Sequence, residues 1–66
     1  MRQLPQAIAD FDAALQINPK YAEALFGRGV ARRLQGNVAA GDADIAAALV
    51  LDPKVADELA RRGVRP

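Results

Sequence analysis

The chain has 66 residues, a mass of 7.0 kDa, and a net charge of +1 from nine basic and eight acidic side chains. It contains no cysteine, histidine, serine, threonine or tryptophan, which excludes disulfides, Ser-His and Cys-His nucleophiles, and thiolate or imidazole metal sites. We therefore expect no enzymatic activity, no cofactor and no metal. The small charge and the lack of a long apolar run argue against nucleic acid and membranes as partners.

Two helices are predicted in the first half of the chain. Apolar residues recur at helical spacing over residues 4–15, and Pro5 suits a first turn, where its missing N–H costs nothing. Asn18 precedes a proline and therefore avoids the α conformation, which ends this helix. A second helix is expected over residues 21–35, with Gly36 at its C-terminal cap.

The second half of the chain repeats these signals. Asn37 is a favourable N-cap for a third helix over residues 38–51, and Asp52 ends that helix before Pro53. A fourth helix, over about residues 54–62, resembles the start of the second. No segment alternates apolar and polar residues, so the predicted fold is all-α, with four helices and no strand.

An internal repeat of 34 residues relates the two halves. Aligned at that offset, positions 1–32 and 35–66 share 12 identical pairs, of which alanine supplies only four. The pairs are Ala9/Ala43, Asp10/Asp44, Ala13/Ala47, Ala14/Ala48, Leu15/Leu49, Pro19/Pro53, Lys20/Lys54, Ala22/Ala56, Leu25/Leu59, Arg28/Arg62, Gly29/Gly63 and Val30/Val64. The chain therefore contains two offset copies of one helical unit.

Several residues of this unit also match a known helical repeat. The matching positions are Leu25, Gly29, Gly36, Ile45, Ala48 and Pro53. The order and spacing of these residues resemble those of the tetratricopeptide repeat (TPR) family. This resemblance implies an α-solenoid fragment of antiparallel helix-turn-helix repeats. On this resemblance, residues 22–55 form one complete repeat. Residues 3–21 are the second helix of a preceding repeat, and residues 56–66 the first helix of a following repeat or cap.

The resemblance also makes predictions about packing. Gly29 and Ala48 are small, so they are expected to let the paired helices approach closely. Arg32 stands where the family usually has an aromatic residue, and Gly41 where it has a small residue early in the second helix. Because glycine inside a helix costs about 1 kcal/mol relative to alanine, Gly41 is expected to weaken the packing. Arg32, which replaces the aromatic residue, is expected to weaken it as well.

The resemblance implies a non-enzymatic scaffold that holds a protein or peptide on a concave surface lined by the first helix of each pair. Carried onto this chain, the partner-binding residues are Glu23, Phe26, Val30, Arg33, Lys54 and Val55, continued by Asp57 and Ala60. The carboxylate clamp of chaperone-binding members is absent, because Phe26 and Val30 occupy its lysine and asparagine positions. For Phe26 the alternative is packing against a neighbouring repeat or another subunit.

Charge is sorted along the chain. Residues 3–18 and 37–52 are acidic, whereas residues 20–35 and 54–66 are basic. The basic helices would line the inner surface and favour an acidic partner or the outer face of a second copy; the alternative is a solvated surface that promotes solubility.

The incomplete repeats bear on assembly. Because stacked repeats cover one another, we also expect a homo-oligomer or a longer array, of which this chain could be the terminal cap. A cytosolic location is the default, because the first residues lack the apolar run of a secretory signal.

Overall fold

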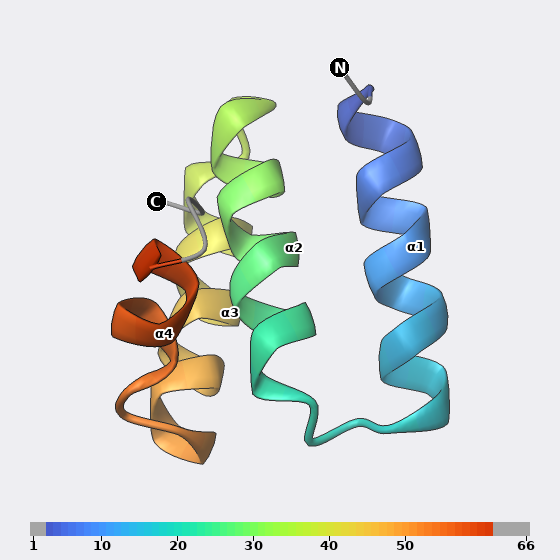
Figure 1. Cartoon of the computed structure of the whole chain (residues 1–66). Helices are drawn as coiled ribbons and strands as arrows, with labels where there is room; N and C mark the ends of the chain where they lie inside the picture. The colour runs from blue at the N-terminus through green and yellow to red at the C-terminus, as the bar shows by residue number, and fades with distance from the viewer. Residues whose placement is uncertain (1–2, 62–66) are drawn as a thin grey trace.

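The computed structural model describes residues 3–61, and within them it has four helices and no strand. The helices are α1 (Leu4–Ile17), α2 (Ala22–Leu34), α3 (Val38–Leu51) and α4 (Val55–Arg61), joined by short turns (Figure 1). The all-α prediction is confirmed, and the helix ends agree with it to within one residue where they are described. Residues 62–66 and the side chain of Ala60 lie outside the described part. None of the helices in residues 3–61 has the length and apolar content needed to cross a membrane.

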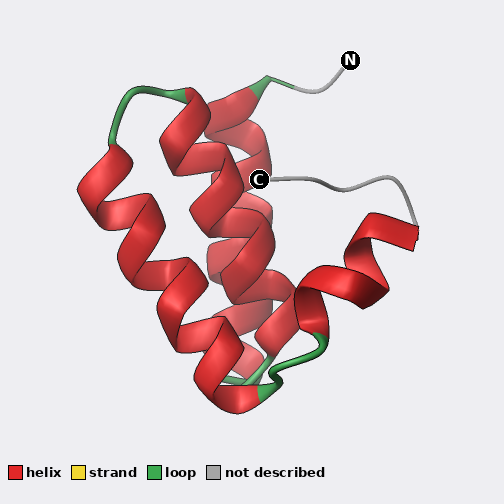
Figure 2. Ribbon diagram, turned by 90° about the vertical axis from the view of Figure 1, so that its left-hand side faces the viewer, coloured by secondary structure: helices red, strands yellow, loops and turns green. Residues whose placement is uncertain are grey.

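Helix α2 is at the centre of the fold. It contacts α1, α3 and α4, and α3 also contacts α4, whereas α1 contacts only α2 among the described helices. Figure 1 shows α1 and α4 on opposite sides of α2, with α3 behind it, and Figure 2 shows α4 inclined to the longer helices. No residue of α1 (Leu4–Ile17) is fully buried.

The turns show the internal repeat at atomic level. The side chain of Asn18 accepts a hydrogen bond from the backbone N–H of Lys20 at 3.1 Å, and Asp52 accepts the same bond from Lys54 at 3.0 Å. Each is a local turn that an Asx side chain stabilises. The α2–α3 turn is different, because there Gly36 adopts a φ of +91°, which glycine reaches without steric cost.

The core lies between α2, the end of α3 and α4. Its buried members are Leu25, Phe26, Ala48, Val55 and Leu59. Phe26 and Val55 have the largest fully buried side chains, at 1% and 0% exposure. Burial of such side chains contributes about 1.5–3 kcal/mol each, so these two are major contributors to the stability of a small fold.

Gly41 is placed where α2 and α3 come closest, contrary to the expectation that it weakens the packing. A Cβ on Gly41 would lie 2.5 Å from the carbonyl oxygen of Gly29 and 2.5 Å from Cγ of Arg33. The three atoms nearest to a Cβ on Gly29 belong to Gly41, Asp44 and Ile45. The close approach that was predicted for Gly29 and Ala48 is therefore made by the two glycines, and Ala48 fills the core beside it.

We expect Gly41→Ala to destabilise the chain by about 1–3 kcal/mol, although alanine favours helices. The methyl group would meet backbone atoms of α2, which cannot move without separating the helices. Gly27→Ala is the matched control, because the three atoms nearest to its methyl would all belong to the ring of Phe11, the nearest being Cζ at 2.5 Å, and that side chain can turn aside. Urea denaturation followed by circular dichroism would measure both variants, and a Gly41→Ala chain as stable as the wild type would contradict the close contact.

Candidate functional site

Arg28 joins three helices through hydrogen bonds to two carboxylates. Its Nε and Nη2 atoms donate to the two oxygens of Asp44 on α3, each at 2.9 Å, and its Nη1 donates to Asp12 on α1 at 2.7 Å. Arg32 also donates to Asp44 at 2.9 Å. The acidic helices α1 and α3 are therefore joined to the basic helix α2 by partly buried ion pairs, and two arginines of α2 are engaged by the chain's own carboxylates.

The network keeps Arg28 charged. The hydrogen bond to Asp44 raises the pKa of Arg28 above the ordinary arginine value, against an opposing effect of desolvation, and the hydrogen bond to Asp12 raises it further. Asp44 is 7% exposed, and among the described residues no buried side-chain nitrogen or oxygen lacks a hydrogen-bond partner. Arg28 thereby links α1 to α3, and these two helices have no direct contact with each other.

Two of the six residues predicted to bind a partner are in the core. Phe26 and Val55 are almost completely buried by α2, α3 and α4 of the same chain. Their side chains are therefore not available to a partner in this structure, and the prediction is corrected for these two. The alternative considered for Phe26, packing against a neighbouring repeat, agrees with its place in one buried cluster with Leu59, which lies in the segment predicted to start the following repeat.

The other four predicted residues differ in accessibility. Val30 is half-buried against the core, and Lys54 is exposed in the turn before α4. Arg33 is exposed and lies 3.5 Å from Asp42 in an ion pair. Glu23 is half-buried and lines a groove, described next. A role in partner binding stays a prediction for these four. It also stays a prediction for Asp57, which is exposed in the first turn of α4.

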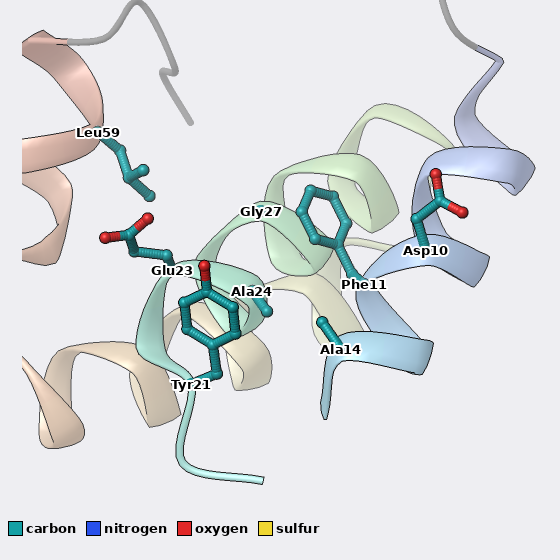
Figure 3. A pocket seen from close by; sticks show the side chains of 8 residues that line it. All are labelled: Asp10, Phe11, Ala14, Tyr21, Glu23, Ala24, Gly27 and Leu59. Atoms are coloured by element: carbon teal, nitrogen blue, oxygen red, sulfur yellow. The ribbon is translucent and has the colours of Figure 1, made fainter. Parts of the chain in front are cut away.

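A groove of about 310 Å³ lies between α1, α2 and α4. It is lined by Asp10, Phe11, Ala14, Tyr21, Glu23, Ala24, Gly27 and Leu59. Figure 3 shows Phe11 reaching from α1 over Gly27 of α2, with Tyr21 and Glu23 at the start of α2. The missing side chain at Gly27 makes room for the ring, because a Cβ there would overlap it.

The lining is apolar with acidic groups beside it. Apolar side chains from α1, α2 and α4 form most of the surface, while Asp10 and Glu23 supply two carboxylates and Tyr21 a phenol. An apolar depression of this kind has the character of a site that accommodates an apolar side chain. Within residues 3–61, no cluster of acidic, histidine or cysteine side chains is arranged to hold a metal ion.

Among the groove residues, the sequence predicts only Glu23 as a partner-binding residue. Phe11 and Ala14 belong to the predicted apolar face of the first helix. No pattern in a single sequence shows which part of such a face is covered by another helix. The repeat contained the missing signal, because these residues align with Ile45 and Ala48 of α3, which lie against α2.

One comparison with known proteins gave a match. A family model of the TPR repeat matches residues 3–36, just over half of the 66-residue chain. The chain belongs to the TPR family. No curated protein and no solved structure matched the chain. TPR repeats are in general non-enzymatic modules that mediate protein–protein interaction.

The TPR match spans α1 and α2, together with both turns that follow them. It therefore crosses the boundary predicted between residues 21 and 22, and the assignment of residues 22–55 as the complete TPR stays a prediction. In the structure α2 contacts both α1 and α3, as the middle helix of stacked TPR units does when each covers its neighbour.

Proposed function

We propose that this TPR chain is a non-enzymatic interaction module that anchors a helical segment of a partner in the groove between α1, α2 and α4. The observation that supports the proposal is the composition of the groove. Phe11, Ala14 and Leu59 provide an apolar floor, and Tyr21 is 43% exposed at its edge. Exposed aromatic side chains beside an apolar depression are frequent anchors of protein interfaces.

A helix is the occupant that suits walls made of helices. Ridges of side chains on one helix fit the grooves between others, and apolar residues spaced by three or four along the partner reach the same face. The volume of about 310 Å³ is near the lower limit for ligand pockets, so it accepts an anchoring side chain rather than a whole ligand.

The charge around the groove favours a basic partner. Asp10 and Glu23 line the groove, and although each already has an interaction within the chain, a carboxylate accepts several hydrogen bonds. None of the eight described lining residues is basic. The arginines that suggested an acidic partner, Arg28 and Arg32, already donate to Asp44. We therefore propose a partner helix that places an apolar residue in the groove and an arginine or lysine one turn further along.

Selection of peptides on the full chain tests this proposal. We expect peptides enriched from a display library to carry leucine or a similar residue followed by arginine or lysine at the third or fourth position. Ala14→Phe should fill the groove and weaken their binding by about tenfold or more. Ala13→Phe is the matched control, because Ala13 is exposed on the same helix and does not line the groove.

The two variants separate the groove from the rest of the surface. Binding that is weakened by Ala14→Phe and retained by Ala13→Phe supports the proposal. Peptides that bind both variants as tightly as the wild type would place the interaction elsewhere on the chain. Circular dichroism of each variant checks that the helices are retained.

A further inference from the structure

The two copies of the internal repeat differ in how well they are covered. On α3, Asp44 and Ala48 are 7% and 0% exposed. On α1, the identical residues at the 34-residue offset are Asp10, which is exposed, and Ala14, which is half-buried. Since the residue types are the same, the difference comes from what is packed against each helix.

Helix α2 covers this face of α3 with three residues. Arg28 donates to both oxygens of Asp44 through its Nε and Nη2 atoms. A Cβ on Gly29 would lie 3.1 Å from Cβ of Asp44, so the two helices approach closely there. Leu25 belongs to the same buried cluster as Ala48. A leucine, an arginine and a glycine at positions i, i+3 and i+4 of one helix therefore bury this face of α3.

The matching face of α1 borders the groove. It carries Asp10, Phe11 and Ala14, which line the groove and which Figure 3 shows together on α1. At the 34-residue offset these three align with residues of α3 that lie against α2. The face of α1 is therefore suited to the kind of helix that covers its copy, with an apolar side chain beside Ala14 and a positive charge beside Asp10.

Within the described part of the chain, no helix that carries this set is available to cover α1. The leucine, arginine and glycine of α2 are used against α3. The sequence repeats the set at residues 59–63, but Leu59 is 6% exposed because it is packed in the chain's own core. The occupant of the groove is therefore a helix of a partner.

We propose that the groove recognises a partner helix with leucine, arginine and glycine at positions i, i+3 and i+4, which lies along α1 as α2 lies along α3. This inference rests on the proposed function of the groove and narrows the class of its partner. The leucine would lie against Ala14, and the arginine would donate to both oxygens of Asp10. The glycine would let the two backbones approach each other.

The geometry at Asp44 is the reason to expect arginine rather than lysine in the partner. A guanidinium presents two parallel N–H groups to a carboxylate, whereas an ammonium acts as a point charge. Arg28 uses this pairing, with both hydrogen bonds at 2.9 Å. The interaction that Asp10 already has within the chain does not prevent such a contact, because Asp44 accepts hydrogen bonds from two arginines.

The copy within the chain also sets the direction of the partner helix. Helices α2 and α3 are joined by a short turn and run antiparallel (Figure 1), so the partner should run antiparallel to α1. Ala7 stands where α3 has Gly41, and its methyl group holds the partner further from α1 than α2 is from α3. Binding should therefore be weaker than the α2–α3 contact.

A fluorescently labelled peptide with the sequence of residues 21–35, which contains α2, is the probe for the test. Fluorescence anisotropy with the full chain, from micromolar to millimolar concentration, measures its dissociation constant. We expect the peptide to bind, and Arg28→Lys in the peptide to weaken binding by about fivefold or more although the charge is kept. Asp10→Asn in the chain should weaken binding by a similar factor. It should also remove the difference between the arginine and lysine peptides, because the two changes act on one contact.

Asp42→Asn in the chain is the matched control. Asp42 is an exposed carboxylate on α3 that does not line the groove, so its loss should leave the binding of both peptides unchanged. Circular dichroism of each chain variant checks that its helices are retained. The comparison of the arginine and lysine peptides on the wild-type chain does not depend on the folding of any variant.

A peptide that does not bind, that binds equally with arginine and lysine, or that is as sensitive to Asp42→Asn as to Asp10→Asn overturns this inference. If peptides selected from a library depend on Ala14 but lack the leucine, arginine and glycine pattern, only this inference fails and the groove keeps its proposed function. If no selected peptide depends on Ala14, both fail.

Discussion

Phe26→Ala should leave the chain largely unfolded at room temperature. The ring is 1% exposed, and removing a buried aromatic side chain costs about 3–5 kcal/mol. A core in a domain of this size rarely supplies more than about 3–5 kcal/mol, so the loss is comparable to the whole stability. Helix content by circular dichroism and the midpoint of urea denaturation would measure the effect.

The control for this variant is a large apolar residue outside the core. Val50 is 84% exposed, so Val50→Ala should change stability by no more than about 0.5 kcal/mol. A Phe26→Ala chain with the same denaturation midpoint as Val50→Ala would show that the ring is not in the core. Because Phe26→Ala removes the fold, a loss of partner binding by this variant would report unfolding and not a binding contact.

Asp44→Asn should have the next largest effect, with a loss of about 2–3 kcal/mol. The amide keeps the size of the side chain but removes the charge that holds Arg28 and Arg32. Hydrogen bonds to charged groups are worth about 1.5–3 kcal/mol, and the side chain of Arg28, at 20% exposure, would keep only Asp12 as its carboxylate partner. Denaturation in urea at neutral pH would measure the loss.

The exposed ion pair on the same two helices provides the comparison. Asp42 lies 3.5 Å from Arg33, with both side chains substantially exposed, so Asp42→Asn should cost less than about 0.5 kcal/mol. Equal losses for the two variants would contradict a special role for Asp44.

The pKa of Arg28 is raised, so its contribution to the free energy of unfolding is fully present below the ordinary arginine pKa and is lost only as the pH rises above that value. No loss of stability from this group is therefore expected in the usual working range of pH.

The helices could be predicted from the sequence because their signals are local. Asn18 and Asp52 each precede a proline, and the steric effect on the residue before proline acts whatever the rest of the chain does. Gly36 is similar, because the positive φ that it adopts is a property of one residue in one turn. The predicted ends of α1, α2 and α3 therefore agree closely with the structure.

The candidate site was harder to predict because it depends on which faces are covered. Phe26 and Val30 lie four residues apart on α2, yet the structure buries the first completely and the second only in part. Arg28 could not be assigned to Asp12 and Asp44 either, because these residues are each 16 positions away in the sequence. Such contacts follow from the relative placement of three helices, which periodicity within one helix does not specify.

The weak attachment of α1 has a consequence for recognition. This helix has no fully buried residue, it contacts only α2 among the described helices, and its bond to Arg28 is its link to α3. Elements with few buried contacts open at a lower free energy than the whole domain. We therefore expect α1 to move away from α2 at a lower free-energy cost than unfolding of the core between α2, α3 and α4, so that the width of the groove can adjust to occupants of different size.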